Sequence, residues 1–166
     1  MRKMARTGRF YEEFEVGATY QHHWGRTLAE AECHLFTTWT QNANPLLVMN
    51  VVFGMTVEDL SEQALAHLGY WAMVFHKPVY PGQTLYAESV VLDKRESGSK
   101  DDRGIVHVRT TGKNELGAVV LSYERKILVK RRSAYASEAE RTSPPGLKLP
   151  ETSPGPSKDE SAGAPR

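Results

Sequence analysis

The sequence predicts an α+β domain in which a curved antiparallel β-sheet wraps around one central apolar helix. Residues 45–57 are apolar on every side, which is typical of a helix enclosed by other elements. Residues 64–130 read as consecutive strands and turns, which would cover this helix and contain no second one. Asn44 is a suitable N-cap and Pro45 suits the first helical position. The four valines of the stretch favour extended structure, so a strand is the alternative.

Length, charge and cysteine content limit the class of protein. The 166 residues are enough for one domain with a hydrophobic core, and a net charge of +1 argues against a broad nucleic-acid-binding surface. No apolar run approaches the ~20 residues that span a bilayer, and the N-terminus lacks the apolar segment of a signal peptide. Cys33 is alone, which excludes an internal disulfide and a cysteine-built zinc site. We therefore expect a cytoplasmic protein without a membrane or nucleic-acid partner.

Two elements precede the central helix. Residues 19–26 suit a first strand, and a helix is expected from Leu28 to about Gln41. Thr27 is its predicted N-cap, with Glu30 as the capping-box partner. Spacings of three and four predict that this helix buries Ala31, Leu35, Phe36 and Trp39.

Four further strands are predicted after the central helix, which should end near a solvated Glu58 and Asp59. Their ranges are 64–74, 84–94, 105–111 and 119–130, with a hairpin turn over 114–117 before the last. The last strand is the clearest because two kinds of side chain alternate along it. One face carries Val119, Leu121, Tyr123, Ile127 and Val129, and the other carries Ser122, Glu124, Lys126 and Lys130. Alternation of this kind predicts an antiparallel sheet with one face in water.

The composition changes from residue 133 onward. Six of the nine prolines fall in residues 133–166, together with Ser, Gly, Glu and Lys. Such a segment cannot bury enough apolar surface to offset its chain entropy, so we expect a disordered tail, with a binding tail as the alternative.

Seven short motifs, in their order and spacing, carry a resemblance to a known family. They are Gly8–Gly17, Gly25–Thr27, Asn44–Leu46, Val52–Ser61, Leu68–Tyr70, Pro78–Leu85 and Val119–Tyr123. Together they resemble the MaoC-type hotdog family, and among its members the hydratases of branched enoyl-CoA thioesters of the mesaconyl-CoA or itaconyl-CoA kind. The resemblance covers residues 8–132 and implies a hotdog domain there, followed by the tail of residues 133–166.

The family hydrates or dehydrates a carbon–carbon double bond beside a CoA thioester, which implies an acyl-CoA substrate and no metal or redox cofactor. The family's Asp and His, which transfer the protons, fall at Asn42 and Leu47, on either side of Asn44. Neither Asn42 nor Leu47 exchanges a proton near neutral pH, and a segment that closes the active site in relatives is absent before Val48. Losing a general acid–base group alone commonly costs ~10²–10⁴-fold in rate. The resemblance thus places Asn42 and Asn44 at catalytic positions of a site with impaired catalysis.

Substrate-binding positions follow from the same resemblance. Free amide groups in the first turn of the central helix, at Leu47 and Val48, suit a developing oxyanion, with capping or water as the alternative. Tyr80 and Gly82 lie in a segment similar to one near the pantetheine channel, although a strand-connecting turn explains it equally. Arg131 would hold the CoA phosphates, or else lie at a solvated strand end. The six histidines are expected to be structural or exposed, because none has metal-ligand spacing.

Two functional hypotheses remain from the sequence. The first is a MaoC-like hydro-lyase that acts on a short branched enoyl-CoA thioester. The second is a non-catalytic hotdog subunit that pairs with an intact homologue, which the replaced acid–base residues favour. Either requires at least a homodimer or a heterodimer with another hotdog subunit, because a single curled sheet leaves an unpaired edge. A thioesterase shares the fold, but no acidic residue stands near the helix start.

Overall fold

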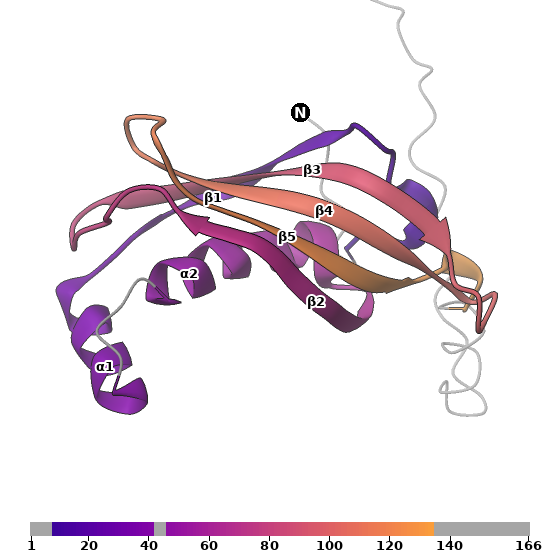
Figure 1. Ribbon diagram of the computed structural model, residues 1–166, viewed down its shortest axis with the longest axis horizontal. Coiled ribbons are helices and arrows are strands. Elements are labelled where there is room, and N and C mark those ends of the chain that lie inside the picture. The colour runs from indigo at the N-terminus through magenta and orange to yellow at the C-terminus, as the bar shows by residue number, and fades with distance from the viewer. Residues whose placement is uncertain (1–7, 42–45, 135–166) are drawn as a thin grey trace, which may run out of the picture.

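Five antiparallel strands form one sheet that arches over a helix in the computed structural model, which describes residues 8–41 and 46–134 (Figure 1). The strand order is β1-β3-β4-β5-β2. In chain order the elements are η1 (Tyr11–Glu13), β1 (Thr19–Thr27), α1 (Glu30–Thr40), α2 (Leu46–Thr56), the π-helical turn η2 (Val57–Ser61), β2 (Ala64–Phe75), β3 (Thr84–Glu96), β4 (Arg103–Asn114) and β5 (Val119–Lys130). The predicted fold class is confirmed, and the strand 119–130 has the predicted bounds.

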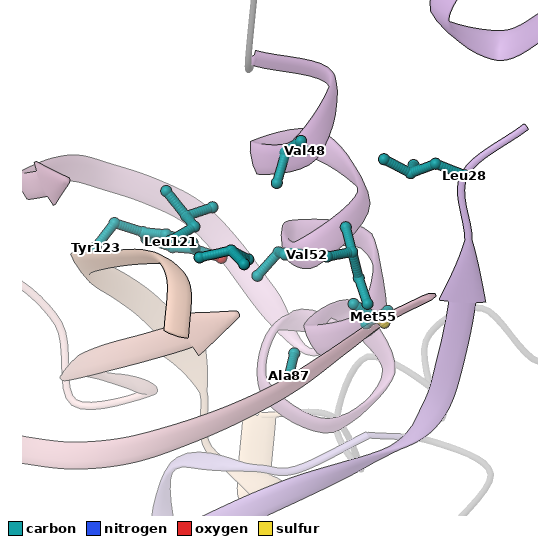
Figure 2. Close-up of a cluster of buried hydrophobic side chains, with 9 residues drawn as sticks. Leu28, Val48, Val52, Met55, Ala87, Leu121 and Tyr123 are labelled. Atoms are coloured by element: carbon teal, nitrogen blue, oxygen red, sulfur yellow. The ribbon is translucent and has the colours of Figure 1, made fainter. Parts of the chain in front are cut away.

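Helix α2 packs on the inner face of the sheet through one side. Val48, Val52 and Met55 are buried against side chains from β3 and β5 (Figure 2). Gly112 on β4 makes this close packing feasible, because a Cβ there would lie 2.8 Å from a methyl carbon of Val52. The opposite side of α2 is open in the described structure, where Gly54 is exposed. The sheet therefore encloses the helix on one side and leaves the other for a further surface.

The start of α1 differs from the prediction. The N-cap is Ala29, whose amide donates to Oε2 of Glu32 at 2.9 Å, so Thr27 and Glu30 do not form the capping box. Thr27 is instead the last residue of β1, and its hydroxyl lies 2.7 Å from that of Thr84 on β3. The pairing of β1 with β3 extends to Thr27, one residue further than predicted, so α1 begins later in the chain than predicted.

The predicted buried face of α1 is also wrong. Ala31 and Leu35 are exposed, Trp39 is 78% exposed, and only Phe36 is half-buried. The helix projects beyond the end of the sheet (Figure 1), so its periodic apolar face meets no layer in the described structure.

Several predictions concern residues outside the described ranges. These are the N-cap at Asn44, the helical Pro45, the site residue Asn42 and nearly all of the tail from 133. No described helix has both the length and the apolar character that crossing a bilayer requires.

The close packing of α2 against Gly112 gives the first prediction. Gly112→Ala should lower the free energy of unfolding by about 1–3 kcal/mol, because the new methyl group overpacks against Val52. Gly98→Ala is the matched control, since nothing lies within 4 Å of a Cβ at that position. Urea denaturation followed by circular dichroism measures both, and equal stability of the two variants would contradict the packing described here.

Candidate functional site

A cleft of about 670 Å³ lies at the N-terminal end of α2, between α1 and the connection from β2 to β3. Its lining is mainly apolar, with a few polar and basic groups. The lining residues are Leu28, Cys33, His34, Phe36, Thr37, Leu47, Val48, Phe75, His76, Lys77, Pro78 and Val79. No carboxylate is among them, so the charged groups that the described residues bring to the cleft are all basic.

Leu47 and Val48, two of the predicted binding residues, line this cleft from the first turn of α2. Amide groups in the first turn of a helix lack partners within the helix and carry its positive dipole end. The helix start is therefore suited to an oxygen that gains negative charge. Leu47, in contrast, supplies only an apolar wall at the position where the family resemblance places a His.

The basic side of the cleft comes from the residues that follow β2. The His76 amide donates to the Val120 carbonyl at 2.8 Å, and His76 Nε2 lies 2.8 Å from the Ser122 hydroxyl. Lys77 follows directly and is exposed at the cleft. No sequence motif singled out His76 or Lys77, because only the fold brings the end of β2 beside the start of α2.

Tyr80 and Gly82 lie next to the cleft but do not line it. They belong to a turn in which the Tyr80 amide donates to Gln83 Oε1 at 2.9 Å. Gly82 has φ +90°, a left-handed conformation that favours glycine, and its amide donates to the Leu28 carbonyl at 2.8 Å. The turn thus ties this connection to the segment that leads into α1. The role of Tyr80 and Gly82 at a pantetheine channel stays a prediction.

Arg131 lies away from these residues. It follows β5, whose first residues approach the cleft, and a strand of 12 residues spans roughly 36 Å. Its guanidinium pairs with Glu96 and lies 5.3 Å from the ring centre of Tyr11. The fold therefore does not bring Arg131 together with Leu47 and Val48, and its assignment to CoA phosphates stays a prediction.

A buried polar network connects β1 to η2 at the other end of α2. His22 Nδ1 lies 2.8 Å from Asp59 Oδ2, and His22 Nε2 lies 2.9 Å from the Ser89 hydroxyl. Ser89 continues to the Thr110 hydroxyl at 2.8 Å, while Arg9 donates to Asp59 Oδ1 at 3.1 Å. The hydrogen bond from His22, assisted by Arg9, holds the pKa of Asp59 below its usual value against the opposing effect of burial. Asp59 is thus a structural anchor, and the prediction of a solvated helix end is wrong for it.

A second cavity, of about 560 Å³, lies between β1 and the other flank of α2. Trp24, Met55 and Val57 form apolar walls, and the charged lining residues are Arg26, Glu58 and Glu62. Trp24 donates to Glu58 at 3.3 Å. An anionic group is better matched by the basic cleft, because two carboxylates and one guanidinium line this cavity. Among the described residues, no group of three or more His, Cys, Asp or Glu side chains is placed to hold a metal ion.

Comparison with known proteins relates the chain to one group of enzymes. A family model described as mesaconyl-CoA hydratase matches residues 43–162, which extends past the predicted domain end at 132. The mesaconyl-CoA hydratase of Cereibacter sphaeroides is 35% identical over 157 positions, covering 82% of this chain and 46% of that protein. That 82% corresponds to about 136 residues of this chain. Roughly 21 of the 157 aligned positions therefore carry no residue of this chain.

Solved structures agree. A MaoC domain protein dehydratase from Chloroflexus aurantiacus has a TM-score of 0.73 at 31% identity, covering 90% of this chain and 46% of that one. A Mycobacterium tuberculosis protein with a double hotdog fold has a TM-score of 0.69 at 20% identity, covering 75% of this chain and 45% of that one. The chain therefore has a hotdog fold and spans about half the length of these proteins.

The network at His22 predicts a stability that depends on pH. Because the folded-state pKa of Asp59 is below the usual 3.8, its contribution is present above that value and is lost as pH falls through the folded-state pKa. Asp59→Asn should lower the free energy of unfolding at pH 7 by about 1–3 kcal/mol and flatten its dependence on pH between roughly 5 and 2.

Chemical denaturation across that range measures the effect. Asp93→Asn, at an exposed position on β3, is the control and should follow the wild-type curve. A variant at Asp59 with the full wild-type slope would show that the carboxylate does not anchor η2.

Proposed function

This chain belongs to the mesaconyl-CoA hydratase family, and we propose that it is one hotdog unit of a MaoC-like hydro-lyase that acts on a short branched enoyl-CoA thioester such as mesaconyl-CoA or itaconyl-CoA. The observation that carries the proposal is the cleft at the start of α2, which is apolar and bears basic groups but no carboxylate among its described lining residues. An apolar acyl chain with anionic ends matches such a lining. The apolar walls would remove water from the acyl chain, and the few basic groups would orient its anionic ends.

Adding water across a double bond beside a thioester places negative charge on the thioester oxygen. A helix N-terminus stabilises such charge without reorganising during the reaction, and Leu47 and Val48 bring the first turn of α2 to the cleft. The proton transfers also require a base that activates water and an acid for the α-carbon. The described lining offers the imidazole rings of His34 and His76. His34 Nε2 lies 3.7 Å from Oε1 of Glu30, which does not itself line the cleft, and His76 contacts the Ser122 hydroxyl.

A second candidate is a non-catalytic unit that pairs with an intact hydratase homologue. Leu47 at the cleft favours it, as does the shorter match to the Cereibacter sphaeroides enzyme, which has roughly 21 positions without a residue of this chain. A loss before α2 would remove catalytic groups and leave the sheet intact. Because the chain spans about half of that relative, we propose that the complete enzyme contains a second hotdog unit, supplied by the same or another chain.

An assay of the purified chain separates the two candidates. Crotonyl-, mesaconyl- and itaconyl-CoA are added in turn, and loss of the enoyl absorbance is followed while calorimetry measures binding. The first candidate predicts binding with turnover, slowed by about 10²–10⁴-fold relative to a hydratase with its acid–base pair. The second predicts binding without turnover. Failure to bind any of the three thioesters would overturn both.

The basic groups of the cleft predict which thioester binds best. Lys77→Met should weaken the binding of mesaconyl-CoA, which has a free carboxylate, by about 10- to 100-fold, since a hydrogen bond to a charged group is worth roughly 1.5–3 kcal/mol. Crotonyl-CoA, with a neutral acyl group, should bind as before.

Lys113→Met is the matched control. Lys113 pairs with Glu88 at 2.7 Å and does not line the cleft, so neither thioester should be affected. Equal weakening of both thioesters by Lys77→Met would place the lysine at the CoA phosphates instead of the acyl carboxylate.

A further inference from the structure

The cavity of about 560 Å³ between β1 and α2 takes no part in the proposed function, although its volume is that of a small-molecule site. Met55 and Val57 give it an apolar wall. Trp24 lines it from β1 and is 55% exposed. A tryptophan that the fold leaves this open has an aromatic surface available to a ligand.

Gly54 keeps the α2 side of this cavity open. It lies within α2, which continues into η2, and glycine is the least favourable residue after proline in a helix interior. Gly112 is required by packing, because a Cβ there would lie 2.8 Å from Val52. Nothing lies within 4 Å of a Cβ at Gly54. No described neighbour therefore explains this glycine, and a larger side chain would project into the cavity that it lines.

An irregularity in β1 directs Trp24 toward the cavity. The register of β1 with β3 shifts between Gln21 and Gly25, so residues 22–24 stand opposite a single residue of β3. Bulges of this kind redirect side chains and are frequent beside functional sites. The Trp24 indole donates to Glu58 Oε2 at 3.3 Å, which fixes the ring beside a carboxylate.

The uncompensated charge of the cavity is negative. Arg26 lines it too, but its guanidinium pairs with Glu32 on α1. The Glu58 carboxylate lies 3.8 Å from His23 Nε2, which is longer than a hydrogen bond. Glu62 makes no side-chain hydrogen bond or ion pair with another described residue. A ligand here meets an aromatic surface, an apolar wall and two carboxylates.

We propose that this cavity binds a small organic cation of the alkylated or quaternary ammonium class. Cations bind over the face of tryptophan better than over other aromatic rings, and most strongly when they are desolvated. Alkyl groups on the nitrogen contact Met55 and Val57, while Glu58 and Glu62 balance the charge. A bare metal ion fits less well, because the described residues place no three His, Cys, Asp or Glu side chains together.

This site is separate from the basic cleft at the start of α2. The cleft and the cavity have no lining residue in common. Their opposite charges also favour different ligands, since the carboxylates repel an anionic thioester and the basic groups of the cleft repel an organic cation. The proposal therefore does not rest on the proposed function, and the two can fail independently.

The tests use the full chain, with choline as the cation and 3,3-dimethylbutanol as an uncharged analogue of the same shape. The indole N–H resonance of Trp24 in an isotope-labelled sample reports binding, and those of Trp39 and Trp71 are internal controls. Choline should shift the Trp24 resonance alone, with a dissociation constant of about 1–10 mM, and the uncharged analogue should bind at least about tenfold more weakly.

Two variants test the site itself. Gly54→Leu fills the cavity and should abolish the choline shift, while the melting temperature stays the same or rises, because leucine is the better helix former. Glu62→Gln should weaken choline binding by about threefold, as expected for an exposed ion pair. Glu15→Gln is the matched control, since Glu15 is exposed and does not line the cavity, and it should bind choline as the wild type does.

Three results would overturn the proposal. Equal binding of choline and 3,3-dimethylbutanol would mean that the cavity is only apolar. A choline shift that survives Gly54→Leu, or that is equal at all three indole resonances, would mean that the cation binds elsewhere. A fall in the melting temperature of Gly54→Leu would mean that another part of the protein or a second copy already fills this space.

Discussion

The close packing of α2 against the sheet determines where every other feature of the molecule lies. Val52 sits over Gly112, and a side chain at that glycine would move the helix outward. With the helix in this position, its N-terminal turn meets the end of β2 and the start of β5, which forms the basic cleft. Its C-terminal end leads into η2, where the His22 and Asp59 pair joins it to β1. One packing contact therefore orients both ends of the helix.

The two ends of α2 have different chemistry for a physical reason. At the start, helix amide groups and basic side chains favour anionic ligands, and the described lining supplies no negative charge to oppose them. At the other end, the Asp59 carboxylate is held by His22 and Arg9, so it stabilises the fold and is not offered to a ligand. The basic cleft and this anchor therefore lie at opposite ends of α2, a helix of 11 residues, with Asp59 in the η2 turn that follows it.

Sequence patterns predicted the parts of the fold that depend on local alternation and missed those that depend on distant partners. The alternation in β5 and the apolar stretch of α2 can each be recognised from one continuous segment of sequence, so both elements were predicted. The apolar face of α1 was predicted to be buried, but burial requires a covering layer that periodicity cannot supply. His22 and Asp59 are 37 residues apart, and no spacing rule connects them. The burial of Arg125, which is 0% exposed, did carry a signal, because this residue falls in phase with the buried residues of β5.

Leu47 bears on whether this hotdog unit could catalyse the proposed reaction alone. It places an apolar side chain in the cleft where the family resemblance expects a proton-transfer group. Such a replacement would be a defect in a self-sufficient enzyme. It becomes consistent if a second hotdog unit, as proposed above, supplies the proton transfer. The family's roughly twofold longer relatives contain enough chain for such a second unit.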